Sequence, residues 1–268
     1  MCLIVLAWKV IPGMPLVVAS NRDEFYARPS SAAGWWEDQP DIYAGRDLQD
    51  GGTWMGVTRE GRFAALTNFR GESEHRTDAP SRGALVAAYL SGTATPQDYL
   101  QEIAAEADRY NGFNLLLGDR SSLFWYSNRG EGDARNGRPL ETGVYGLSNA
   151  LLDTPWPKVT RAKAQFASLL CQGAPPETYF EMLGDTTRAS DCRLPDTGIG
   201  IDRERMLSSV FILSSDYGTR ASTLLCVPAV GLPSLIEQTI DPLAPEYQIL
   251  PTTDRHTTTT CKMKVDYR

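Results

Sequence analysis

The residue whose type and position most directly suggest chemistry is a cysteine at the second position, Cys2. Removal of the initiator methionine is favoured when the next side chain is small, and it would leave Cys2 with a free α-amino group whose pKa is roughly 7.7–8.0. Such an amine can take the proton of its own thiol and act as a general base without a histidine. The competing interpretation is a small buried hydrophobe, because Cys2 opens an apolar run.

A nucleophile of this kind needs a carboxylate to hold the amine and a cation to favour the thiolate. The polar segment NRDE at 21–24 follows an apolar run that we expect to pair with the first run in a hairpin. A hairpin brings the end of its second strand beside the start of its first. Asp23 is therefore expected to reach the α-amine, and Arg22 to lower the pKa of the Cys2 thiol. The alternative is a polar strand end with an Asx-type turn.

The composition argues against several other classes of function. The 268 residues carry 26 Lys and Arg against 33 Asp and Glu, a net charge of −7, which provides no basic field for nucleic acid. The two histidines, His75 and His256, lie far apart and there is no C-x-x-C pair, so the common local zinc motifs are missing. The five cysteines are an odd, scattered set and indicate free thiols in a reducing compartment. We expect no metal and no cofactor.

The apolar N-terminal segment does not have the pattern of a targeting sequence. Lys9 lies inside the run, and Pro12, Gly13 and Pro15 interrupt it. A secretory signal has basic residues before its apolar core, and a membrane helix needs about 20 uninterrupted apolar residues. The sequence therefore predicts a cytoplasmic protein without a membrane span.

Apolar runs and turn residues predict grouped strands and helices. Strands are expected at 2–8, 15–20, 53–58, 62–68, 113–118, 122–127, 144–148, 209–214, 220–227 and 235–240. Helices are expected between an N-cap at Ser81 and Gly92, from Thr95 to about Tyr110, and near 157–171 and 176–183. Grouped rather than alternating elements favour antiparallel sheets with helices stacked outside them. We expect one domain over residues 1–268, with a tail at 256–268 that forms an edge strand or is poorly ordered.

Several long motifs carry a family resemblance. They are CLIVLAW, ASNRDEFYARP, AGRDLQDGGTWMGVTREGRFAALTNFR, FNLLLGD, YGLSNALLDTPWPK and YGTRAST. Together they resemble the NRDE family, which is related to the transport-and-Golgi-organisation proteins of animals, over most of residues 2–225. That family is similar to N-terminal nucleophile hydrolases. The resemblance implies an α+β fold of four layers, αββα, in which two antiparallel sheets lie between helices.

The resemblance also implies roles for individual residues. The better understood relatives are the penicillin-V acylase and bile-salt hydrolase group, amidases that use an N-terminal cysteine. By position, Cys2 resembles their nucleophile and Asp23 the aspartate that holds the amine. Asn68 and Asn149, in LTN and LSN, resemble their two oxyanion-side asparagines, and Arg220, in YGTR, resembles their late active-site arginine.

One departure from those amidases concerns the cation near the thiol. They carry an arginine three residues before the aspartate, where this chain has Ser20, and Arg22 lies two positions later on the same face of the strand. Four further residues are candidates for substrate binding, although aromatic residues at strand ends are more often part of the core. These are Asn21, Trp36, Trp54 and Arg46.

The leading hypothesis is an N-terminal cysteine hydrolase, matured by methionine removal or autocatalysis, that cleaves a non-peptide amide or ester of a small acyl substrate. The alternative is a non-catalytic protein that binds or traffics an apolar or haem-like ligand in the same cavity, with His75 and His256 as weak haem-ligand candidates. A redox-sensing thiol is a third possibility. The sequence does not predict an oligomeric state.

Overall fold

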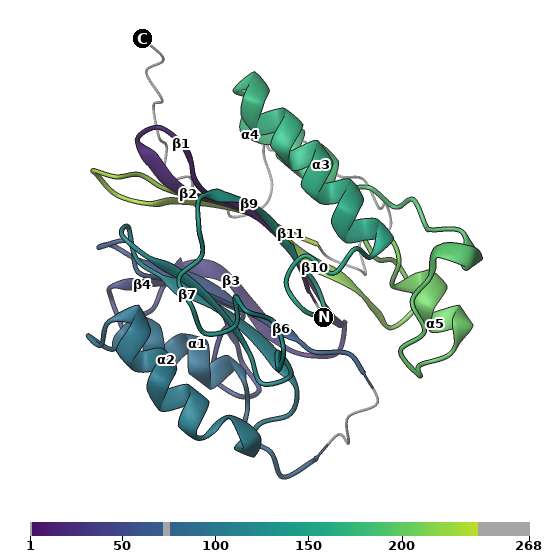
Figure 1. Cartoon of the computed structure of the whole chain (residues 1–268), viewed down its shortest axis with the longest axis horizontal. Coiled ribbons are helices and arrows are strands. Elements are labelled where there is room, and N and C mark those ends of the chain that lie inside the picture. Colours follow the sequence, from purple (N-terminus) through teal and green to yellow (C-terminus); the bar gives the residue numbers. More distant parts are fainter. Residues whose placement is uncertain (1, 72–75, 241–268) are drawn as a thin grey trace.

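The computed structural model describes residues 2–71 and 76–240, and these form two antiparallel sheets packed face to face (Figure 1). The first sheet has the strand order β11-β10-β2-β1-β9, and the second runs β3-β4-β5-β6-β7-β8. The strands of the first sheet are β1 (Cys2–Ile11), β2 (Met14–Phe25), β9 (Gly143–Leu147), β10 (Tyr217–Val227) and β11 (Ser234–Thr239). Those of the second are β3 (Ser30–Trp35), β4 (Ile42–Asp47), β5 (Met55–Thr58), β6 (Phe63–Asn68), β7 (Phe113–Gly118) and β8 (Leu123–Ser127).

The two central strands of the first sheet form the hairpin predicted from the sequence. β1 and β2 are apolar on both faces because each face packs against another layer. Even-numbered residues such as Trp8 point toward the second sheet, and odd-numbered residues such as Val5 point toward the helices. The register places Cys2 directly opposite Arg22.

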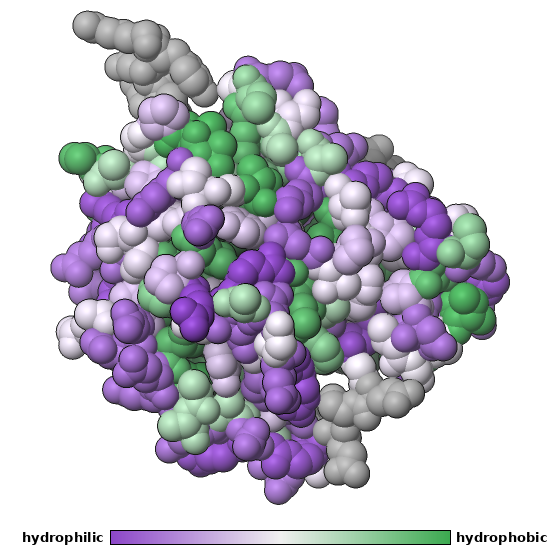
Figure 2. Space-filling view, viewed as in Figure 1, coloured by the Kyte–Doolittle hydropathy of each residue, from purple (hydrophilic) through white to green (hydrophobic). Residues whose placement is uncertain are grey.

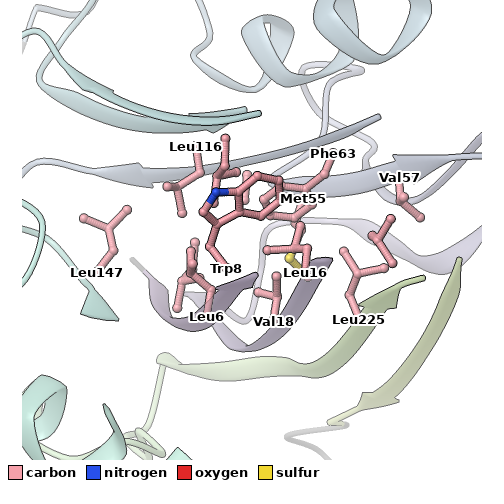
Figure 3. Packing of buried hydrophobic residues seen from close by; sticks show 14 of the residues in the cluster. Leu6, Trp8, Leu16, Val18, Met55, Val57, Phe63, Leu116, Leu147 and Leu225 are labelled. Atoms are coloured by element: carbon pink, nitrogen blue, oxygen red, sulfur yellow. The ribbon is translucent and has the colours of Figure 1, made fainter. Parts of the chain in front are cut away.

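The largest apolar cluster fills the space between the sheets (Figure 3). Trp8 lies at its centre and is 1% exposed. Leu6, Leu16 and Val18 approach it from the first sheet, while Phe63 and other residues approach from the second (Figure 3). Burying side chains of this size stabilises the fold by roughly 1.5–3 kcal/mol each.

Helices cover the outer face of each sheet. α1 (Gly83–Ser91) and α2 (Pro96–Ala105) pack on the second sheet, and α3 (Pro157–Gln172) and α4 (Pro176–Leu183) pack on the first (Figure 1). The remaining helices are α5 (Ile201–Met206) and the short 3-10 segments η1 (Ala107–Arg109) and η2 (Asp191–Arg193). The expected α+β sandwich with αββα layers is therefore confirmed.

Three sequence expectations differ from the structure. Residues 209–214 form no strand, because β10 already pairs with β2 on one side and β11 on the other, so this apolar run is buried as irregular chain. The first helix is not capped by Ser81: its N-cap is Arg82, which makes no side-chain capping bond. α2 is capped by Thr95 as expected, but it ends at Ala105 and is followed by η1.

Two features lie outside these expectations. Strands β3 and β4 were not predicted, because glycine and polar residues interrupt their apolar pattern. The tail at 256–268 lies outside the described residues.

The molecular surface matches the charged composition. The face shown in Figure 2 is mostly hydrophilic, with smaller hydrophobic areas between the polar groups. None of the helices in the described part of the chain is long and apolar enough to cross a membrane.

Candidate active site

A cavity of about 410 Å³ opens at the end of the central hairpin, and Cys2 lies in its wall. Arg22, Asp23 and Asn68 line the same cavity, so the structure brings four of the residues selected from the sequence together. The strand ends of β1, β2 and β6 supply them. Residues on strands in two packed sheets are held more rigidly than residues on a free loop, which suits a catalytic arrangement.

Cys2 is 8% exposed, and its surroundings act on the thiol in opposite directions. Burial raises the pKa of Cys2, and the nearby Asp23 carboxylate raises it further. Arg22 and a hydrogen bond from the Asp23 backbone lower it. Arg22 acts in the direction expected from the sequence, but burial is the largest effect and the net direction of the thiol pKa is upward. The thiol therefore needs a base to become a nucleophile at neutral pH.

The cation opposite the thiol is fixed by an aromatic ring. The guanidinium of Arg22 lies over the Trp54 ring, 4.2 Å from its centroid, and Arg22 is 5% exposed. Trp54 in turn depends on Gly45, because a Cβ at that position would lie 2.3 Å from the indole. Gly45 belongs to the AGRD motif, so this part of the motif has a packing explanation.

Asp23 is 1% exposed and points to the helix side of β2. Its Oδ1 accepts a hydrogen bond of 2.8 Å from Thr219 Oγ1, which lies directly opposite on β10. Tyr217 donates its hydroxyl to the Asp23 carbonyl at 2.9 Å. Burial raises the pKa of Asp23, while Lys158 lowers it. Thr219 and Tyr217 belong to the YGTR motif, although sequence reasoning selected only its arginine.

The two asparagines have different surroundings. Asn149 is fully buried and is not among the residues that line the cavity; its Nδ2 donates to the backbone carbonyl of Asn68 at 2.8 Å. The neighbouring Ser148 hydroxyl donates to the carbonyl of Cys2 at 3.0 Å. Asn149 thus ties the end of β6 in place, whereas the Asn68 side chain lies at the cavity.

Arg220 does not line the cavity. It sits at a β-bulge in β10, where the pairing with β2 shifts register, and a bulge turns the side chain away from the regular alternation. Its Nη1 lies 3.1 Å from the carbonyl oxygens of Phe25, Tyr26 and Arg28. Arg220 therefore stabilises the segment at the end of β2, residues 25–28, through these hydrogen bonds.

Three of the four binding candidates also lie elsewhere. Asn21 is fully buried, and its amide is hydrogen-bonded to the Leu183 and Val210 carbonyls. Trp36 packs in the cluster between the second sheet and its helices, with the Arg46 guanidinium over its ring at 4.2 Å. Only Trp54 lines the cavity.

The cavity wall holds charged residues that sequence reasoning missed. Arg28 pairs with Asp47 and Asp50, each at 2.6 Å, and the Arg82 side chain donates to the Gly112 carbonyl at 2.9 Å. The other charged lining residues are Glu24 and Arg76. Their signal was weak because isolated charged residues are normally solvent-exposed.

The structure offers no new support for a metal or haem site. His75 and His256 lie outside the described residues. Across residues 2–71 and 76–240, no cluster of three or more His, Cys, Asp or Glu side chains could hold a metal ion.

The fold and the site define an αββα sandwich protein with a cysteine at the start of a central strand, facing a polar cavity. The chain belongs to the Transport and Golgi organisation 2 family, whose profile matches residues 1–242. It is 37% identical over 242 residues to the Transport and Golgi organization protein 2 homolog of Bos taurus, covering 84% of this chain and 86% of that protein. Identity to the Homo sapiens homolog is 36%, with the same coverage.

Solved structures with a similar arrangement are more distant. A conjugated bile acid hydrolase from Clostridium perfringens aligns with a TM-score of 0.42 and 10% identity, over 88% of this chain and 89% of that one. The Caenorhabditis elegans ortholog of N-acylethanolamine-hydrolyzing acid amidase aligns with a TM-score of 0.42 and 12% identity, over 85% and 94% of the two chains.

Proposed function

We propose that this protein is an N-terminal cysteine hydrolase that cleaves a non-peptide amide or ester bond of a small acyl substrate. The observation that carries the proposal is the position of Cys2, in the wall of a cavity and directly opposite a buried arginine. The proposal rests on this chain's own residues.

The reaction begins with removal of Met1, which frees the α-amine of Cys2. The amine takes the thiol proton, and Sγ forms a bond to the substrate carbonyl carbon. In this proposal the Asn68 amide stabilises the oxyanion, and Asp23 holds the protonated amine. The amine then gives its proton to the leaving nitrogen or oxygen as the carbon–leaving group bond breaks. Water hydrolyses the thioester, which releases a carboxylic acid and restores the thiol.

The raised pKa of the Cys2 thiol favours this general-base route over a preformed thiolate. The charged wall favours a substrate with polar or ionised groups, because an apolar ligand would leave buried guanidinium and carboxylate groups desolvated. The same argument weighs against the alternative function, which is the binding or trafficking of an apolar or haem-like ligand.

Intact-mass measurement on the purified protein tests the proposal. Incubation with p-nitrophenyl esters of short and polar acids is expected to give a chain lighter by one methionine that carries an acyl adduct on Cys2. The Cys2→Ala variant is expected to lose adduct and turnover, whereas Cys171→Ala, at an exposed cysteine, keeps both. Turnover unchanged in Cys2→Ala would refute the proposal. Stoichiometric ligand binding with Met1 retained would instead support the carrier.

A further inference from the structure

A buried lysine in the first turn of α3 is not used by the proposed reaction. Lys158, the last residue of the DTPWPK motif, is 2% exposed. Among the described residues, no hydrogen-bond acceptor lies within reach of its Nζ. Lysine is among the residues least often buried, and a buried ammonium normally has a partner. The position of Lys158 therefore calls for a compensating interaction.

Two effects disfavour a cation at this position. Burial removes the hydration of the ammonium and lowers the pKa of Lys158 to about 8. The N-terminus of a helix carries a partial positive charge that repels a cation, and the first turn of α3 contains no acidic residue. Attraction from other elements has to offset both effects.

Four charged or ionisable groups act on Lys158 from the elements around it. Asp23 on β2 is the strongest attractive group, Cys2 on β1 and Glu204 on α5 act in the same direction, and Arg70 opposes them. Arg70 and Glu204 form a buried pair with 3.1 Å between Nη2 and Oε2. Because those two neutralise each other, the ammonium is left to balance Asp23 and Cys2.

The alternation of side chains along β2 explains how the Lys158 ammonium acts on this site from the helix side of the sheet. Val17 and Ala19 of β2 pack on the helix side, and the alternation along the strand puts Asp23 on that side as well. Cys2 and Arg22 lie on the opposite side, toward the cavity. Arg22 thus approaches the thiol from the cavity, while Lys158 approaches Asp23 from the helix layer.

We propose that Lys158 is a positioning residue of the Cys2 site, and that its ammonium is the counter-charge that holds Asp23 as a carboxylate at the strand end that carries the nucleophile. The inference rests on the proposed function only for the role of Cys2 as the nucleophile. Removing the ammonium takes away one of the buried positive charges that stabilise the Asp23 carboxylate and any thiolate at Cys2. The reactivity of the thiol then falls, and its dependence on pH moves to higher pH.

The rate of Cys2 alkylation by iodoacetamide, followed by peptide mass from about pH 6.5 to 10, tests the inference without any substrate. Lys158→Met removes the charge at similar length, and Lys158→Arg keeps it. Lys163→Met is the matched control, because Lys163 lies on the same helix and pairs with Asp153 at 2.7 Å. Lys158→Met is expected to react about tenfold more slowly at neutral pH, the change that corresponds to one pKa unit. Lys158→Arg and Lys163→Met are expected to stay close to wild type at that pH.

A folded Lys158→Met protein with the wild-type rate and pH profile would overturn the inference. If Lys158→Met does not fold, Lys158→Arg tests the inference at pH values above about 8, where the arginine is charged and the wild-type lysine is not. It should then react severalfold faster than wild type, and coincident profiles would overturn the inference. The proposed function can fail separately. If the wild type never forms an acyl adduct, but Lys158→Met still reacts more slowly than the wild type with iodoacetamide, the hydrolase is contradicted and the positioning role is supported.

Discussion

The different surroundings of the two asparagines predict that their alanine variants fail in different ways. In Asn68→Ala the backbone carbonyl that accepts from Asn149 remains, so the hydrogen bond between the two segments is kept. Only the amide at the cavity is lost. Loss of one oxyanion donor typically lowers kcat by about 10²–10³-fold, and we expect that loss with little change in stability.

Asn149→Ala removes the fully buried amide and leaves the Asn68 carbonyl without its 2.8 Å donor. A hydrogen bond of this kind contributes about 1 kcal/mol net, and an unsatisfied buried acceptor adds about 1–3 kcal/mol. We therefore expect a loss of about 2 kcal/mol in the free energy of unfolding. For a chain of this size that lowers Tm by about 4–8 °C.

The assay is thermal unfolding together with the rate of Cys2 acylation by an active ester at a temperature where every variant is folded. Asn136→Ala is the stability control, because its side chain bonds the Ser127 backbone at 2.8 and 3.0 Å away from the cavity. It should lose stability without losing acylation. A stable Asn149→Ala protein whose acylation rate falls as far as that of Asn68→Ala would refute the reasoning and assign Asn149 the oxyanion role.

Three further predictions concern the same region. Gly45→Ala should displace the Trp54 indole and lower both stability and Cys2 reactivity. The control is Gly34→Ala, which should have little effect because no atom lies within 4 Å of an added Cβ. Near-ultraviolet circular dichroism measures the displacement of the indole, and alkylation rates measure the reactivity of Cys2. Arg22→Met should slow alkylation about tenfold, the change that corresponds to one pKa unit, because the guanidinium lowers the pKa of the Cys2 thiol. A Met variant with the wild-type pH profile would contradict this. Lys158 has a folded-state pKa of about 8, below its unfolded value of 10.5, so the unfolded chain binds more protons between these pH values. Urea unfolding should therefore show the free energy of unfolding rising with pH in this range by up to about 3 kcal/mol. Lys158→Met should lose that rise.

The sequence was most informative where local rules determine geometry. A tight turn after β1 dictates antiparallel pairing, so the approach of the NRDE segment to Cys2 follows from the hairpin alone. The four-layer arrangement came from the family resemblance, because periodicity shows which faces are buried and not what covers them. The strand expected at 209–214 was wrong for a related reason: β-propensity does not show that the neighbouring strand in sequence, β10, is already paired on both sides.

The roles of individual polar residues were harder to predict. Arg220 matches the position of an active-site arginine in the family motif, but the bulge at this residue redirects it, and a bulge leaves no local signal in the sequence. Lys158 was missed because a lysine in a helix is normally solvent-exposed. The carboxylates that act on it, Asp23 on β2 and Glu204 on α5, are distant in the sequence.

In the proposed mechanism, the arrangement around Cys2 replaces the histidine that acyl chemistry often uses. The N-terminal strand lies between β2 and β9, so its first residue is fixed by pairing and by the Ser148 hydroxyl. Positive side chains lie on both faces of the sheet at this strand end, Arg22 on the cavity side and Lys158 on the helix side. Neither cation supplies the base in this proposal, because the Arg22 guanidinium stays charged and Lys158 lies on the helix side of the sheet. The proposed mechanism therefore uses the α-amine as the base, and release of Met1 is the step expected to make the buried thiol a nucleophile.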